Sequence, residues 1–148
     1  MYDIAIVGAG PAGASAALFA AKAGKKVLLL DSDQGMTRRA WVENHYGVEK
    51  ISGTDLVDLG HRQATRFGAW LVKTKVTGIQ RKDEGFELIT DDGSYAARYV
   101  ILATGATVEL AQAAGVETIP GTEPRIKAIV KTDRDGRTNI PGIWAAGT

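Results

Sequence analysis

The sequence contains no cysteine and only two histidines. A disulfide, a thiolate nucleophile and a cysteine metal site are therefore excluded, and a histidine metal site is disfavoured, so we predict no metal centre. Basic and acidic residues nearly balance at 18 against 17, which gives no indication of nucleic acid or of an anionic membrane surface as partner. The apolar stretch of the first predicted helix is interrupted at Lys22 and is too short to span a bilayer.

Length and apolar content fit one globular α/β protein. The chain has 148 residues, of which 45% are apolar, enough to form one core and too few for two comfortable domains. We expect a single domain over residues 1–148. The N-terminus leads directly into a predicted strand and carries Asp3 in place of a basic leader, which argues against a signal peptide and favours the cytoplasm.

The chain opens with a strand, a glycine-rich turn and a helix. The apolar stretch 2–7 leads into Gly8, Gly10 and Gly13, and an alanine-rich stretch predicts a helix over 12–23. In such a turn the first glycine permits the tight bend, the second lets the backbone approach a pyrophosphate, and the third lets the helix pack close to the strand. The helix N-terminus offers free N–H groups to the phosphates.

A second apolar stretch, 26–31, ends in Asp31, which lies 18 positions after Gly13. At this spacing the carboxylate can accept hydrogen bonds from ribose hydroxyls. The acidic pair Asp31 and Asp33 argues against a 2′-phosphate, which an arginine usually accommodates. The segment therefore predicts a bound dinucleotide, and the alternative is a glycine-rich turn without a ligand.

The rest of the sequence predicts a central parallel sheet with helices and an antiparallel β-meander. Residues 32–51 are predicted to form an irregular loop, of a length that is usually functional. Apolar residues alternate with polar ones between Val76 and Ile89, and turn residues near 82–85 and 91–93 predict the meander. The other predicted helices and strands cover about 52–67, 70–72, 99–103, 108–114, 126–130 and 143–146.

Five separated segments occur together in the order of one protein family. They are the turn 8–13 with Asp31, and the stretches 42–47, 66–69, 100–106 and 140–147. Together they resemble the FAD-binding domain of thioredoxin reductases and related flavoproteins with two dinucleotide-binding domains. The resemblance extends over nearly the whole chain and implies a Rossmann-like FAD-binding domain, with FAD rather than NAD as the cofactor.

The resemblance also implies which residues hold the cofactor. The glycine turn would hold the pyrophosphate, Asp31 the adenosine ribose, and Asn44 would lie near the isoalloxazine ring. The backbone of Val76 would meet the adenine, and Gly147 would bring backbone to the flavin side. The complete implied set is Gly8, Gly10, Pro11, Ala12, Gly13, Asp31, Ser32, Asn44, Val76, Ala103, Thr104, Gly105 and Gly147.

The sequence departs from the thioredoxin reductase pattern in two ways. It has neither a second glycine-rich fingerprint nor a cysteine pair, so a nicotinamide domain and thiol–disulfide exchange by its own residues are excluded. This pattern is similar to that of single-domain relatives of thioredoxin reductase. In addition, Thr148 stands where the family usually has an aspartate. Either the natural chain continues past this residue with a helix that covers the last strand, or the flavin end is unusually open. We favour the first, because an uncovered last strand would expose apolar surface.

Three functions fit these observations. The first is an FAD-dependent oxidoreductase, reduced by NAD(P)H or by a redox partner protein, in which the flavin carries the electrons. The second is a non-catalytic FAD-binding module or flavoprotein subunit. The third, an NAD-binding dehydrogenase domain, is disfavoured by the meander. The family resemblance further suggests a homodimer.

No catalytic residue is predicted, but several side chains have two interpretations. His45 could donate a proton to reduced flavin or be an exposed loop residue, and the second is favoured. Trp41 and Tyr46 could stack on the flavin or cover the core. Arg38 and Arg39 could attract an anionic substrate or partner, but a solvated surface is favoured. His61 is interpreted as a surface residue.

Overall fold

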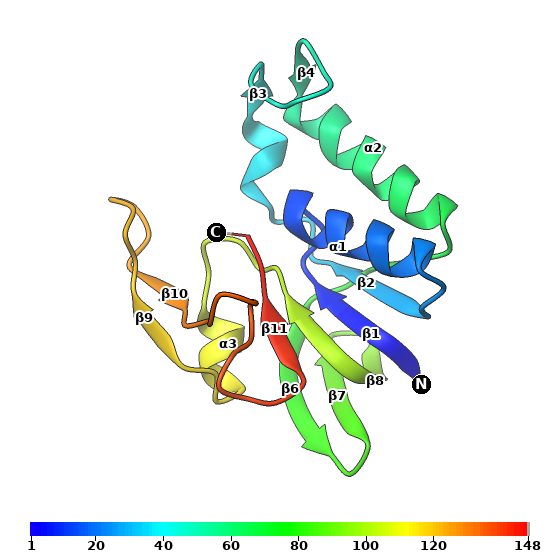
Figure 1. Cartoon of the computed structure of the whole chain (residues 1–148), viewed down its shortest axis with the longest axis vertical. Helices are drawn as coiled ribbons and strands as arrows, with labels where there is room; N and C mark the ends of the chain where they lie inside the picture. The colour runs from blue at the N-terminus through cyan, green and yellow to red at the C-terminus, as the bar shows by residue number, and fades with distance from the viewer. Residues whose placement is uncertain (148) are drawn as a thin grey trace.

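A seven-stranded sheet forms the centre of the computed structural model, which describes residues 1–147 (Figure 1). Thr148, which stands where the family usually has an aspartate, lies outside the described residues. The sheet has the order β5-β2-β1-β8-β7-β6, and β11 pairs with β8. Its strands are β1 (Tyr2–Val7), β2 (Val27–Asp31), β5 (Trp70–Lys73), β6 (Val76–Lys82), β7 (Gly85–Thr90), β8 (Gly93–Leu102) and β11 (Ile143–Ala145).

The parallel half of the sheet confirms the predicted architecture. β1 runs parallel to both β2 and β8, while β5 extends the sheet beyond β2 and β11 extends it beyond β8. All five residues of β2 are buried, as expected for a strand that is covered on both faces. The carboxyl ends of these strands meet at one edge of the sheet. At β1 the order of the strands reverses, because β2 follows on one side and β8 on the other. Open α/β sheets bind ligands at such a switch point.

The long strand β8 joins the parallel half to the meander. Its first part pairs antiparallel with β7, and its second part pairs parallel with β1. Ala97 is the junction, because it pairs with Phe86 on one side and with Tyr2 on the other. The strand predicted over 99–103 is therefore the second half of a ten-residue strand.

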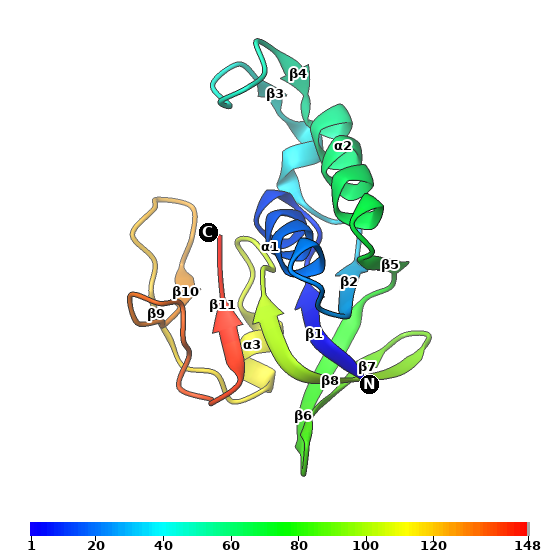
Figure 2. The ribbon, with the colours of Figure 1, turned by 45° about the vertical axis from the view of Figure 1, so that its right-hand side comes forward.

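Two helices cover one face of the sheet. They are α1 (Pro11–Lys22) and α2 (Gly53–Arg66), and α2 lies beside α1 on the side away from β1 (Figures 1 and 2). The buried side of α1 consists of glycine and alanine, which allows close packing on the strands. Ser52 caps the N-terminus of α2, because its Oγ accepts a hydrogen bond from the Asp55 N–H at 3.1 Å.

The core has two layers, one on each face of the sheet. Ile6, Leu29 and Ala17 belong to the layer beneath α1. Leu28, Leu88 and the neighbouring strand residues form the other layer, which is partly covered by α3 (Glu109–Ala113). Alternate residues of each strand thus face opposite layers.

Residues 32–51, predicted to form an irregular loop, contain regular secondary structure. They contain a 3₁₀ turn, η1 (Met36–Arg39), and a short ribbon of β3 (Trp41–Val42) with β4 (Ile51–Ser52). Gly53 closes this segment against η1, because a Cβ on it would lie 1.6 Å from the Thr37 carbonyl oxygen. The sequence prediction also missed β9 (Thr118–Pro120), which pairs with β10 (Ala128–Val130). In residues 1–147, none of the helices has the length and apolarity needed to cross a bilayer.

Candidate dinucleotide-binding site

Two glycines of the turn after β1 are required by the fold itself. Gly8 has φ +103°, and a Cβ there would lie 2.1 Å from the Ala103 carbonyl oxygen. Its N–H donates to the Leu30 carbonyl at 2.9 Å, which ties the turn to the end of β2. Gly13 is equally constrained, because its Cβ would lie 1.7 Å from the Gly8 carbonyl oxygen. Glycine at these two positions therefore lets the turn pack between the ends of β2 and β8.

Gly10 is different, because nothing in the described chain requires a glycine there. Its φ of −75° is available to every residue, and no atom lies within 4 Å of where its Cβ would be. The residue precedes α1, and no side chain caps the helix N-terminus. The open space at Gly10 thus lies beside the uncapped, partly positive end of a helix, a favourable place for an anion.

Asp31 lies at the end of β2 and is only 7% exposed. Its Oδ1 accepts a hydrogen bond from the Asp33 N–H at 2.8 Å. Its Oδ2 is buried and has no hydrogen-bond partner within residues 1–147, and the same holds for the nearby Thr74 Oγ1. Because native proteins pair nearly all buried polar atoms, the unsatisfied carboxylate oxygen calls for a donor that the described residues do not supply.

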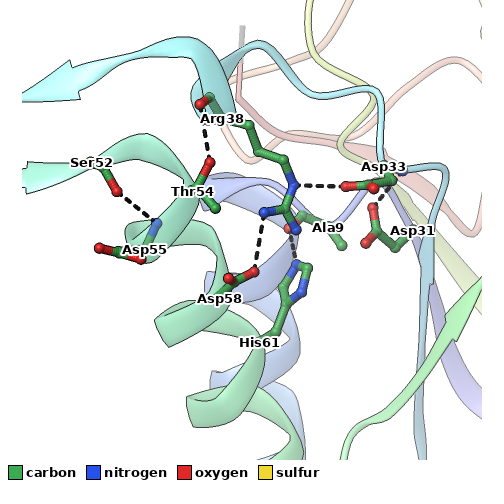
Figure 3. Close-up of polar contacts among 9 residues, drawn as sticks. All are labelled: Ala9, Asp31, Asp33, Arg38, Ser52, Thr54, Asp55, Asp58 and His61. Atoms are coloured by element: carbon green, nitrogen blue, oxygen red, sulfur yellow. Dashed lines mark hydrogen bonds and ion pairs between the residues drawn. The ribbon is translucent and has the colours of Figure 1, made fainter.

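Arg38 joins the segment after β2 to α2. Its Nε donates to Asp33 Oδ1 at 2.7 Å, and its Nη1 donates to Asp58 Oδ1 at 3.1 Å (Figure 3). Partial desolvation lowers the pKa of Arg38, but the hydrogen bonds to Asp58 and Asp33 outweigh it, so the pKa lies above its ordinary value. Arg38 is therefore half-buried and ion-paired, with 25% of its side chain still exposed at the surface.

His61 was also predicted to lie on the surface, and the structure contradicts this. The side chain is 9% exposed, and its Nε2 lies 2.7 Å from the Ala9 carbonyl oxygen (Figure 3). A sequence signal for this position exists, because Val57, His61 and Ala64 are spaced as one buried face of a helix. The two neighbouring arginines, Arg62 and Arg66, obscured that spacing.

The ends of β8 and β11 complete the edge around the turn. Ala103 is buried against the turn, and its N–H donates to the Val7 carbonyl at 2.8 Å. Thr104 Oγ1 donates to the Thr107 carbonyl at 2.9 Å, and Gly105 follows with φ +74°. Gly147 lies next to the start of α1, since a Cβ on it would be 3.0 Å from the Ala12 Cβ.

The remaining implied positions are more scattered. Ser32 is exposed directly after Asp31, whereas the Val76 side chain is buried in the core at the start of β6. Asn44 is exposed in the loop between β3 and β4. In the same segment, Trp41 is 62% exposed and Tyr46 fully exposed, so the interpretation that they cover the core was wrong.

A small cavity of about 90 Å³ lies between α1 and α2, beside the glycine turn. Gly10 and Pro11 line it from the turn, and His45 lines it from the loop between β3 and β4. The loop that carries Asn44 therefore borders the glycine turn through the neighbouring His45.

Comparison with known proteins places this arrangement in a family. The family described as pyridine nucleotide-disulphide oxidoreductase matches residues 2–129 and 69–148. Thioredoxin reductase from Treponema pallidum (strain Nichols) is 39% identical over 109 residues, which cover 71% of this chain and 36% of that protein. Thioredoxin reductase from Mycolicibacterium smegmatis is 35% identical over 125 residues, which cover 82% of this chain and 40% of that protein.

A solved structure shows the same likeness. The atypical thioredoxin reductase TRi from Desulfovibrio vulgaris Hildenborough aligns with a TM-score of 0.67 at 36% identity, over 84% of this chain and 40% of that one. The chain spans about two fifths of the length of these relatives. Thioredoxin reductases are FAD-binding oxidoreductases. The extent of the family match and the shared fold show that this chain belongs to the pyridine nucleotide-disulphide oxidoreductase family and is related to the thioredoxin reductases.

Proposed function

We propose that this chain binds FAD and serves as a flavoprotein oxidoreductase. The observation that carries the proposal is the buried, unpartnered Oδ2 of Asp31, which lies at the end of β2 beside the glycine turn. A ribose hydroxyl would donate to this oxygen after a small rotation of the carboxylate, because the oxygen is buried in the cofactor-free chain. The open space at Gly10 supports the proposal, because it leaves room for a pyrophosphate at the start of α1.

The residues of this edge then have distinct parts in holding the cofactor. Gly10 and the start of α1, including Pro11 and Ala12, would hold the pyrophosphate, and Asp31 with Ser32 would hold the adenosine ribose. Positions 103–105 and Gly147 lie on the other side of the turn, where the flavin half would extend. Asn44 and the Val76 backbone are proposed as contacts to the isoalloxazine ring and to the adenine.

FAD supplies the redox chemistry when it is bound, and the protein supplies binding and orientation. The chain has no cysteine, so electrons cannot pass through a cysteine pair of its own. We infer that NAD(P)H or a redox partner protein reduces the flavin, and that residues 1–148 act as a single FAD-binding domain. A homodimer and a cytoplasmic location remain predictions.

A second candidate is a non-catalytic FAD-binding module or flavoprotein subunit that a partner protein reduces. The lack of any cysteine favours it, since the redox group of a disulfide reductase is missing from this chain. The two candidates differ in whether a nicotinamide alone can reduce the bound flavin.

The visible absorbance of the purified protein tests the proposal. We expect flavin bands after incubation with FAD, and bleaching when NADH or NADPH is added without oxygen. Bands that persist with both nicotinamides would favour the non-catalytic module. Absence of flavin bands after incubation with FAD would refute the proposed cofactor, and copurified NAD without yellow colour would favour a dehydrogenase domain.

A further inference from the structure

The peptide bond between Ala9 and Gly10 is held from outside the turn. The Ala9 carbonyl oxygen lies 2.7 Å from Nε2 of His61, on α2, and the contact is buried. A carbonyl oxygen can only accept, so His61 Nε2 must carry the hydrogen and donate it. The bond joins two positions 52 residues apart in the chain. A helix distant in sequence thus contacts the backbone of the turn.

This contact fixes the direction of the next backbone donor. No cis peptide bond occurs in the described residues, so the Ala9–Gly10 peptide is planar and trans. In a trans peptide the C=O and the N–H point in opposite directions. Because the carbonyl points to His61, the Gly10 N–H points away from α2. Among the described residues it has no hydrogen-bond partner, which leaves it free for an external acceptor.

The ion pairs of Arg38 join α2 to the segment after β2. Asp58 precedes His61 by three residues, so the two side chains rise from the same face of α2 (Figure 3). Asp58 binds Arg38, and Arg38 binds Asp33, two residues after the end of β2. The same helix face therefore contacts the segment after β2 and the turn after β1.

We propose that His61 is a positioning residue of the dinucleotide site. Its Nε2–H fixes the Ala9–Gly10 peptide so that the Gly10 N–H is presented to the pyrophosphate. The inference rests on the proposed function, because the acceptor that it names is the pyrophosphate of FAD. It goes beyond that function by giving a role to a side chain outside the cofactor's own contacts.

The test compares two ligands that differ only in the pyrophosphate, ADP and adenosine, titrated into ¹⁵N-labelled protein. Replacing His61 with methionine keeps the volume and removes the donor, and we expect the Kd for ADP to rise about tenfold, as for a lost hydrogen bond to a buried carbonyl. The Kd for adenosine should change less than about twofold, since this ligand has no pyrophosphate. The Gly10 amide resonance should also move in the unliganded protein.

Two further variants separate positioning from packing. His61→Gln retains an N–H donor at the place of Nε2 and should restore the ADP affinity to within about threefold. Arg62→Met, on the exposed side of the same helix, is the matched control and should leave both ligands unaffected. If His61→Met does not fold, His61→Asn takes its place, because its shorter amide cannot reach the Ala9 carbonyl while Gln can.

Each outcome decides between the two claims. Equal weakening of ADP and adenosine would show a packing role and overturn the positioning role of His61, as would an unchanged ADP affinity or the failure of Gln to restore it. In each of these three cases FAD binding by the unaltered protein would still support the proposed function. If the unaltered protein binds neither FAD nor ADP, the proposed function is refuted together with the role of His61.

Discussion

Replacing glycine by alanine at two positions of the same turn should give opposite results. At Gly10 the φ of −75° suits alanine and the Cβ position is empty. We therefore expect Gly10→Ala to leave the free energy of unfolding of the cofactor-free protein unchanged, or to raise it by up to about 1 kcal/mol through a less flexible unfolded chain. The FAD affinity should fall at least about tenfold, because the new methyl group occupies the space of the pyrophosphate.

At Gly8 the same change should destabilise the fold itself. The φ of +103° is unfavourable for alanine by about 1–2 kcal/mol, and a Cβ 2.1 Å from the Ala103 carbonyl oxygen forces the backbone apart at a further cost of about 1–3 kcal/mol. For a chain of this length, a total of about 3 kcal/mol lowers the melting temperature by roughly 6–12 °C.

The assay combines urea denaturation of the cofactor-free variants with FAD titration by flavin fluorescence. Gly35→Ala is the matched control, since Gly35 has φ −69° and equally open space but lies outside the turn 8–13. It should affect stability as Gly10→Ala does and leave the FAD affinity unchanged. The reasoning is refuted if Gly10→Ala destabilises the protein as strongly as Gly8→Ala, or if it binds FAD as tightly as the unaltered chain.

Two further predictions concern carboxylates. Asp31→Asn keeps an oxygen for the Asp33 N–H and replaces Oδ2 by a donor, so FAD affinity measured by titration should fall about tenfold while the melting temperature stays within a few degrees; retained affinity would contradict the ribose contact. The backbone N–H of Arg137 donates to Asp133 and lowers the pKa of that carboxyl below its ordinary 3.8. The ionised carboxylate therefore stabilises the folded state fully above pH 3.8, and this stabilisation is lost as the pH falls through the lowered pKa. Asp133→Asn should accordingly be less stable than the unaltered chain at pH 6, and this difference should shrink as the pH falls through the lowered pKa. A difference that does not shrink in acid would contradict this linkage.

Local patterns in the sequence predicted the frame of the site well. The strands around the glycine turn, the helix after it and the meander depend on apolar periodicity and turn residues, which neighbouring positions determine. The α/β fold class and the relation to thioredoxin reductases were likewise visible in short segments, and the comparisons confirm them.

Contacts across large sequence distances were the part that the sequence did not reveal. The Arg38 pair with Asp58 spans 20 residues and the His61 contact with Ala9 spans 52, so no local pattern indicates either partner. The exposed positions of Trp41 and Tyr46 depend on how the ribbon of β3 and β4 projects from the sheet, which aromatic residues alone do not reveal.

The pairing of β11 with β8 makes the fold tolerant to large changes in length. The chain leaves β8 at Leu102, and after some forty residues returns on the neighbouring strand, where the Ala146 N–H donates to the Leu102 carbonyl at 2.9 Å. The point where the chain leaves the sheet after β8 and the point where it rejoins the sheet at β11 therefore lie side by side. Since each doubling of a flexible loop adds only about 0.6 kcal/mol of closure free energy, a whole additional domain could be grafted into this excursion while the sheet keeps its register.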